Sequence, residues 1–194
     1  SGSLKTSVQI QSPEDCGRFL ARAISGVNAN APSPAWLVQR LERCGIRSIS
    51  ALVDIGNYVM MEIGQPMHVF DADKLSGCLI VRHAQNGETL QCLNDKTVTL
   101  SDNTLVIADE QKALSIAGMI GGAESAVSDE TRNIVLEAAW FNPLVISGKS
   151  RQYGFGSDSS FRFERGMDSE LQRDAIERAT ELVLQICGGA AGEI

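Results

Sequence analysis

The segment CLIVRHAQNGETLQCLNDKTVTLSDNTLVIAD, residues 78–109, decides the fold class. It consists of short runs rich in Val, Ile, Leu and Thr, and the turn sequences NG, ND and SDN separate these runs. β-Branched and aliphatic residues favour strands, whereas Asn, Asp and Gly favour the tight turns between them. A further run, ALSIAGM at 113–119, continues the pattern. The middle of the chain is therefore predicted to be a meander of strands.

Helical patterns flank this middle region. In SPAWLVQRLERCGIR, residues 33–47, we expect Ser33 to cap a helix, Pro34 to take its first position and Gly45 to end it. ISALVDIGNYVMMEIG, residues 49–64, has apolar residues at helical spacing, and SELQRDAIERATELVLQICGG, residues 169–189, is amphipathic. Residues 15–25 fit a strand or a short helix. Helices around a β-rich middle predict an α+β fold with layered sheets.

Two segments near the C-terminal helix are less regular. NPLVISGKSRQYG, residues 142–154, predicts a single helix that Asn142 caps and Pro143 starts. GSDSSFRFERGMD, residues 156–168, reads as a polar connection that carries arginines. Its Arg and Phe side chains can hold a nucleic-acid end by phosphate pairing and base stacking. A structural role, with Arg165 bonded to Asp168 or Glu164, is the more common case.

Composition narrows the class of protein. The 194 residues are 43% hydrophobic and 21% charged, which indicates one large globular domain or two fused small ones. No apolar run reaches the roughly 18 residues of a membrane span. The net charge of −7 disfavours a general nucleic-acid binder, because phosphate contacts need Lys and Arg. We expect a cytoplasmic protein without a membrane partner.

Five scattered cysteines lack the spacing of a metal site, so we expect no metal and predict buried, reduced thiols. The chain begins SGSLKTSVQ without Met or an apolar stretch. This start indicates a cloning remnant at residues 1–3 on a piece of a longer protein, and not a signal peptide.

The strand-like run NIVLEAAWF, residues 133–141, contains a carboxylate. Alternation places Val135, Glu137 and Ala139 on one face. A carboxylate at such a position either faces solvent or is buried and needs a partner. Because buried Glu is rare, the solvated reading is favoured by roughly two to one.

Two further features leave alternatives open. The glycines of IAGMIGG, residues 116–122, fit neither the dinucleotide-binding nor the phosphate-binding loop pattern. They indicate either a close backbone approach that lines a pocket or a plain turn. His68 lies in GQPMHVFD, residues 64–71, and a lone histidine there is more often a polar turn residue than a catalyst.

Three long segments together resemble a known family. They are residues 43–75 (RCGIRSISALVDIGNYVMMEIGQPMHVFDADKL), 115–141 (SIAGMIGGAESAVSDETRNIVLEAAWF) and 150–168 (SRQYGFGSDSSFRFERGMD). They resemble the B3/B4 region of the bacterial phenylalanyl-tRNA synthetase β subunit, from about Cys16 to the C-terminus. The resemblance implies one B3/B4 editing domain over 1–194, cut from a longer β subunit. It also implies an α+β fold, a layered β-sandwich of unusual topology with flanking helices.

The resemblance also implies a function. In that family the region hydrolyses the ester of tyrosine wrongly attached to tRNA(Phe), which is editing after transfer by phenylalanine–tRNA ligase. The implied partners are the 3′ end of this tRNA and the synthetase α subunit, in an assembly of two α and two β subunits. No cofactor is implied for this domain, whereas ATP and Mg²⁺ are implied elsewhere in the full enzyme. The alternative is a non-catalytic domain that positions tRNA or supports the β subunit, and a free-standing editing hydrolase is less favoured.

Site residues follow from the same resemblance. His68 and Glu137 are implied as the catalytic residues. His68 would orient the attacking water or the terminal ribose, with direct general-base action left as an alternative, and Glu137 would read the tyrosine hydroxyl. The other substrate-binding residues implied are Arg47, Gly121, Gly122, Ser157 and Ser159.

A pocket for Phe discriminates against an added hydroxyl only by about 10², so an editing pocket should be apolar with one or two polar groups at its far end. This chain departs from the family where Gly56 replaces a usual Thr, Ser157 a Thr, Ser159 an Ala and Phe161 a His.

Overall fold

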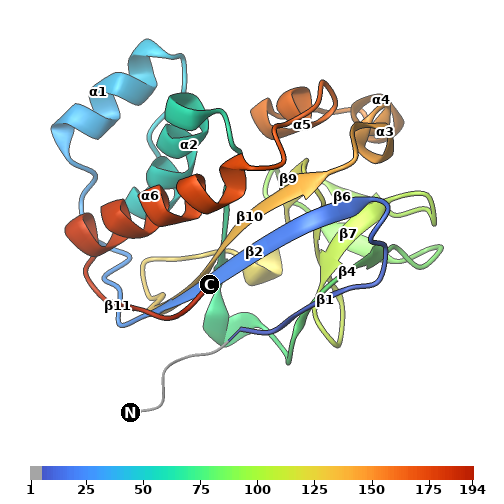
Figure 1. The fold of residues 1–194 in the computed structure, drawn as a ribbon, viewed down its shortest axis with the longest axis horizontal. Helices are drawn as coiled ribbons and strands as arrows, with labels where there is room; N and C mark the ends of the chain where they lie inside the picture. The colour runs from blue at the N-terminus through green and yellow to red at the C-terminus, as the bar shows by residue number, and fades with distance from the viewer. Residues whose placement is uncertain (1–5) are drawn as a thin grey trace.

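The computed structural model describes residues 6–194, so the remnant predicted at residues 1–3 lies outside the described residues. Figure 1 shows a group of helices on one side of two stacked sheets. The strands are β1 (Val8–Ile10), β2 (Cys16–Ser25), β3 (His68–Asp71), β4 (Leu79–His83), β5 (Thr89–Gln91), β6 (Thr97–Thr99), β7 (Leu105–Ala108), β8 (Ala113–Ile116), β9 (Ile120–Gly121), β10 (Asn133–Phe141) and β11 (Ala190–Ala191). The α-helices are α1 (Ala35–Arg43), α2 (Ala51–Ile63), α3 (Pro143–Ile146), α4 (Lys149–Tyr153), α5 (Asp158–Phe163) and α6 (Leu171–Ile186), with 3₁₀ turns η1 (Ala72–Lys74) and η2 (Ala123–Ser125).

Two main sheets make up the β structure. One has the order β1-β4-β7-β8-β9 and the other the order β11-β2-β10-β3, while β5 and β6 form a separate hairpin. The β1–β4 pair is parallel, and the other pairs in the two main sheets are antiparallel. β3 is the outer strand of its sheet, so one of its edges has no neighbouring strand.

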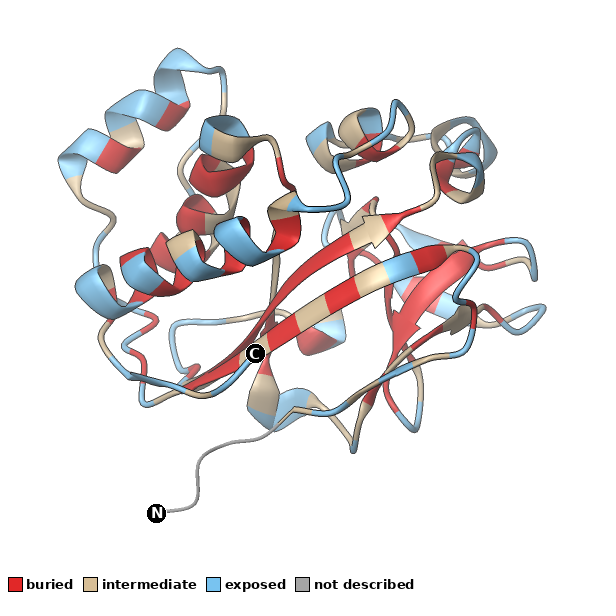
Figure 2. Ribbon diagram, viewed as in Figure 1, coloured by how far each residue is buried: buried red, intermediate tan, exposed pale blue. Residues whose placement is uncertain are grey.

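Three hydrophobic clusters hold the layers together. Helices α1, α2 and α6 pack on one face of the four-stranded sheet, which contributes Ile134, Leu136 and Ala138. The opposite face, with Phe70 and Val135, packs on the five-stranded sheet. The hairpin covers the far side of the five-stranded sheet. Figure 2 shows buried residues along both sheets and on the sheet-facing sides of the helices.

The α+β class and the sandwich with flanking helices are confirmed, whereas the strands of residues 78–119 do not form one continuous meander, because β4 pairs with β7 while β5 and β6 form a separate hairpin. Each predicted run between residues 78 and 119 contains a strand, and residues 15–25 form a strand and not a helix. The predicted second helix and the C-terminal helix are α2 and α6. Gly64 ends α2 with a φ of +93°, a backbone conformation that glycine adopts without steric cost.

Some boundaries differ from the prediction. Ser33 does not cap α1, because its hydroxyl donates instead to Asp54 Oδ2 at 2.5 Å, and Pro34 precedes the helix. Asn142 does cap α3, where its side chain accepts a hydrogen bond from the Leu144 N–H. The single helix predicted over 142–154 is two short helices, because Gly148 adopts a φ of +81° between them.

Residues 156–168 are more ordered than the predicted polar connection. Ser157 and Ser160 form a capping box that starts α5. Within this segment Arg165 donates to Glu164 at 2.8 Å, as the structural reading predicted, and its guanidinium lies 3.5 Å from the centre of the Phe161 ring.

Two predictions about burial are wrong. The solvated reading of Glu137 fails, because the five-stranded sheet covers its face and leaves the residue 6% exposed. All five cysteines are free, but only Cys16, Cys92 and Cys187 are buried. Cys44 is exposed because it follows the last turn of α1 at the surface.

Candidate functional site

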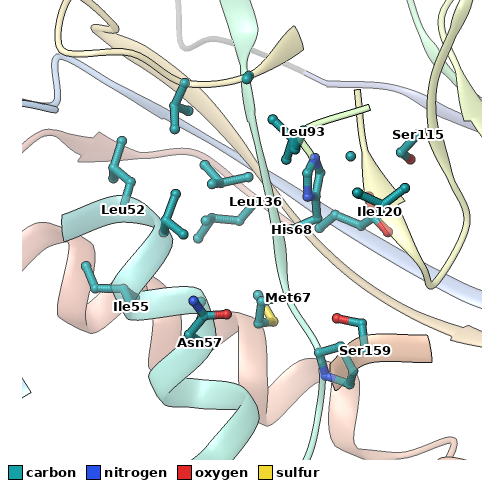
Figure 3. Close-up of a pocket in the computed structure, with 18 of the residues that line it drawn as sticks. Leu52, Ile55, Asn57, Met67, His68, Leu93, Ser115, Ile120, Leu136 and Ser159 are labelled. Carbon is teal, nitrogen blue, oxygen red and sulfur yellow. The ribbon is translucent and has the colours of Figure 1, made fainter. Parts of the chain in front are cut away.

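A cavity of about 540 Å³ lies where α2, β3, the β8–β9 turn and α5 meet. Figure 3 shows its lining on both sides of the β3 ribbon: Leu52, Ile55 and Asn57 project from α2, and His68, Leu93, Ser115 and Ile120 lie across the strand. Most of the lining is aliphatic, and a few polar side chains interrupt it. A largely apolar cavity with a few convergent polar groups is the usual form of a small-molecule site.

Glu137 and His68 are the polar pair at the centre of the cavity wall. The antiparallel register places them directly opposite each other on β10 and β3. Directly opposite residues lie on the same face of a sheet with close Cβ atoms, so both face the space between the two sheets. The sheet register therefore brings together two residues that lie far apart in the sequence.

Both groups have buried polar atoms without a partner. Glu137 Oε2 and His68 Nε2 are enclosed and form no hydrogen bond with any described residue, while the rest of His68 keeps some surface open to the cavity. Burial raises the pKa of Glu137 from 4.5 to about 8 and lowers the pKa of His68 from 6.5 to about 4. At neutral pH the acid is thus protonated and the imidazole uncharged, so each offers hydrogen bonds without a net charge.

Gly121 makes room for the histidine ring. A Cβ at this position would lie 2.4 Å from His68 Cε1 and 3.0 Å from Leu93 Cδ1. On its other side the imidazole meets Phe70 edge-on, with ring centres 4.4 Å apart. The glycine of β9 and the phenylalanine of β3 therefore hold the ring in one place.

Helix α2 contributes a second wall. Val53, Gly56 and Asn57 recur at helical spacing and all line the cavity. A Cβ at Gly56 would have ample room, since the nearest heavy atoms are Met67 Cβ at 3.7 Å and Met67 O at 3.8 Å. This glycine therefore leaves open space on a helix face where most residues would place a side chain.

Ser159 lines the cavity from α5. Its hydroxyl lies 3.9 Å from the sulfur of Met60, a weak contact that joins α5 to α2. Of the sequence-predicted residues, His68, Glu137, Gly121 and Ser159 thus meet around one space.

The structure places the other three predicted residues elsewhere. Arg47 is exposed in the loop before α2, two residues ahead of the cavity residue Ile49. Gly122 packs against the Leu114 carbonyl, which its N–H contacts at 2.7 Å, and lies outside this cavity. Ser157 caps α5 and donates to the Met119 carbonyl at 2.6 Å, so it supports the β8–β9 turn from behind.

Sequence reasoning missed five polar residues of the lining, which are Ser50, Asn57, Ser115, Ser128 and Asp129. Ser115 is 5% exposed, lies opposite Gly121 in the β8–β9 pair, and its hydroxyl bonds to no described residue. It is the polar member of the strand ALSI, whose four residues are all buried, so alternation does not single it out. Asn57 follows Gly56 on the same helix face, and no sequence pattern separates it from an ordinary surface polar residue.

Asp54 shapes the rim of the cavity although it does not line it. The residue is fully buried and accepts hydrogen bonds from Ser33 Oγ, Ser48 Oγ and the Ile49 N–H at 2.5, 2.6 and 2.8 Å. It thereby ties the loop before α1 and the loop before α2 to the helix itself. This network fixes Ile49 at the cavity mouth.

Residues 6–194 contain no group of three or more His, Cys, Asp and Glu side chains placed to hold a metal ion. Every helix in the same range is too short or too polar to cross a bilayer. Apart from the Asp129 carboxylate, the chemistry available in the cavity is hydrogen bonding by neutral groups next to apolar walls. Such an arrangement can recognise a ring with a hydroxyl and position a water next to a reactive bond.

Comparisons with known proteins agree on one family. A family model described as the B3/4 domain matches residues 15–188. The chain is 78% identical over 190 residues to the phenylalanine–tRNA ligase β subunit of Neisseria gonorrhoeae, covering 98% of this chain and 24% of that protein. It is 58% identical over 187 residues to the corresponding subunit of Chromobacterium violaceum, with 96% and 24% covered. The chain thus spans about a quarter of the length of these relatives.

A solved structure supports the fold. It is an N-terminal fragment of the phenylalanyl-tRNA synthetase β subunit from Pyrococcus horikoshii, with a TM-score of 0.57 and 12% identity. The match covers 98% of this chain and 52% of that one. At this identity the likeness concerns the architecture alone.

Proposed function

Because this chain belongs to the B3/4 domain family, in the form found in phenylalanine–tRNA ligase β subunits, we propose that it edits mischarged tRNA. The proposed reaction is hydrolysis of the ester that joins tyrosine to the 3′ end of tRNA(Phe). The proposed unit is the whole of 1–194 as one domain of a longer β subunit. In the full ligase we propose the α subunit and tRNA(Phe) as partners, ATP and Mg²⁺ bound outside this chain, and a cytoplasmic location.

One observation carries the proposal: Glu137 and His68, each with an unpartnered buried polar atom, lie opposite each other in the sheet and line a largely apolar cavity. A protonated carboxyl both donates and accepts a hydrogen bond, which matches a phenol hydroxyl. A phenylalanine ring in the same place would leave these buried groups unpaired, at about 1–3 kcal/mol for each. Sites that hydrogen-bond a substrate hydroxyl can reject the analogue without it by about 10⁴–10⁵.

We assign Glu137 to the tyrosine hydroxyl. It projects from the interior strand β10, where its neighbours are Ala21 on β2 and His68 on β3. Ser115 faces the same space from the opposite sheet and adds a hydroxyl to this end of the cavity. The Glu137 carboxyl lies at a fixed depth in the cavity, so only a ring that reaches this depth and carries a hydroxyl there would form the hydrogen bond.

We assign His68 to orientation of the attacking water or the terminal ribose, and not to proton abstraction. Since its pKa is lowered to about 4 by burial, the imidazole is a weak base at neutral pH. An aminoacyl ester is already activated, so correct placement of a water can supply much of the rate. The packing of the ring between Gly121 and Phe70 suits such a fixed role.

The test uses full ligase carrying this chain and tRNA(Phe) charged with tyrosine. We expect Glu137→Ala and His68→Ala each to slow tyrosine release by at least about tenfold, a loss of about 1.4 kcal/mol of transition-state stabilisation. Glu130→Ala removes an exposed carboxylate without a hydrogen bond or ion pair among the described residues and serves as the control. Normal editing by both site variants would refute the assignment of the site.

A specific observation favours a second function. Gly56 provides no side chain on the helix face that lines the cavity, so this wall lacks a hydroxyl that could hold a water. The alternative is a non-catalytic domain that supports the β subunit or positions tRNA. This alternative would be favoured if the wild-type ligase released tyrosine from tyrosyl-tRNA(Phe) no faster than the uncatalysed reaction does.

A further inference from the structure

The cavity continues beyond the space between the two sheets. Leu136 and Val69 form the pair next to Glu137 and His68 in the β10–β3 register, so their side chains lie on the opposite, helix-facing side of the sheet. Both pairs nevertheless line one cavity. This is possible because β3 is the outer strand, and the cavity passes around its open edge, as the residues on either side of the β3 ribbon show in Figure 3.

We name the part on the helix side the α2 chamber; its walls are Leu52, Val53, Val69, Val127 and Leu136. These walls are aliphatic, Asn57 of α2 adds one polar side chain on this side, and the polar residues Ser50, Ser128 and Asp129 lie at the rim. A flat aromatic group with hydrogen-bonding edges fits apolar walls with a polar rim. A phosphate does not, because the rim has a carboxylate and no cation.

The part of the cavity that passes around the β3 edge suits a polar group that links two ring systems of one ligand. Alternate residues of an outer strand direct their N–H and C=O groups away from the sheet, and here that edge faces the cavity. Gly56 lies across from this edge on α2, and the space its absent side chain leaves is bordered by Met67. A ligand backbone can therefore approach both the strand and the helix closely.

We propose that the α2 chamber binds the adenine of the tRNA's terminal adenosine while the attached tyrosine occupies the space beside Glu137. The ribose and the ester then lie at the β3 edge next to Gly56. This inference rests on the proposed editing function, and adds to it a separate subsite for the nucleoside. The substrate is thus recognised as two ring systems joined by a polar linker that bends around one strand.

The test measures binding of two ligands to the 194-residue chain by calorimetry. One is tyrosinamide, and the other is 3′-deoxy-3′-(tyrosylamino)adenosine, in which an amide replaces the reactive ester. The wild type is expected to bind the adenosine conjugate at least about tenfold more tightly than tyrosinamide. Val53→Trp and Ser128→Trp fill the α2 chamber from opposite sides, and each should remove this gain while tyrosinamide affinity stays within about twofold.

Two further variants complete the design. Ser159→Trp lies on the tyrosine side and should weaken both ligands, whereas Met61→Trp, half-exposed on α2 outside the cavity, should change neither. Since Ser128 lies in an exposed loop, its variant keeps the test valid if the Val53 variant unfolds. Equal wild-type affinities, or equal weakening of both ligands by the chamber variants, would overturn the nucleoside subsite alone. Failure of the wild type to bind either ligand would overturn the proposed editing site as well.

Discussion

Replacement of Glu137 by Gln tests the electrostatics on which the site depends. The substitution keeps the shape of the side chain and its ability to donate and accept hydrogen bonds, but removes its titration. Glu137 is 6% exposed, and burial raises its pKa from 4.5 to about 8. Between these two pH values the folded protein holds a proton that the unfolded chain has released. The free energy of unfolding of the wild type should therefore fall as the pH rises through this range.

The magnitude follows from the size of the shift in pKa. Each unit of pKa difference corresponds to 1.36 kcal/mol, so the cost of keeping Glu137 neutral reaches about 3 kcal/mol at pH 7 and is below about 1 kcal/mol at pH 5. The wild type should lose about 2–3 kcal/mol between pH 5 and pH 7 relative to Glu137→Gln. His68 is present in both proteins, and desolvation lowers its pKa in both, so its contribution cancels in this comparison.

Urea unfolding of both proteins at several pH values between 5 and 8 provides the measurement. Glu130→Gln is the matched control, because Glu130 is exposed and has no described partner, and its pH profile should coincide with that of the wild type. Parallel profiles for wild type and Glu137→Gln would show that Glu137 ionises as a solvated carboxylate. The conclusion that Glu137 is protonated and uncharged at neutral pH would then be wrong.

Three other substitutions test separate parts of the site. Gly121→Ala places a Cβ 2.4 Å from the His68 ring, and should lower stability by about 1–3 kcal/mol in urea unfolding and slow tyrosine release from tRNA; an unchanged rate would contradict the fixed ring position. Asp54→Ala removes three hydrogen bonds from a fully buried carboxylate and should cost at least about 2 kcal/mol, with a change below about 0.5 kcal/mol refuting its role as the anchor of both loops. Gly56→Ala has room for its Cβ within α2 and should stabilise the fold by about 0.5–1 kcal/mol, whereas destabilisation would show that the helix face is already filled.

Local patterns predicted much of the fold because the strands and long helices obey them. Alternation in NIVLEAAWF correctly placed Val135, Glu137 and Ala139 on one face of β10. It could not show that both faces of this sheet are covered, by helices on one side and by a second sheet on the other. The default reading of Glu137 as solvated failed for that reason.

The site was predictable only in part, because sequence identifies residues and not distances. The resemblance selected Glu137, His68, Gly121 and Ser159, which the fold brings to one cavity. It could not reveal that the His68 ring occupies the space a Cβ at Gly121 would need, since this contact depends on β9 folding against β3. Ser115 escaped notice because a single Ser in an apolar strand is as common in a core as in a pocket.

The register that joins β10 to β3 also sets the kind of discrimination this cavity can achieve. Glu137 and His68 lie opposite each other, a placement that on an exposed sheet would favour an ion pair. Here burial moves the two pKa values in the directions that oppose charge, and neither Oε2 nor Nε2 has a described partner. If Glu137 and His68 were charged, binding of either tyrosine or phenylalanine would have to remove water from both charges. Because they are neutral, phenylalanine, whose ring has no hydroxyl, costs only the hydrogen bonds that it cannot form with them. Selection between tyrosine and phenylalanine would then depend on hydrogen-bond matching and hardly on salt, while the approach of the tRNA itself depends on salt through its phosphates.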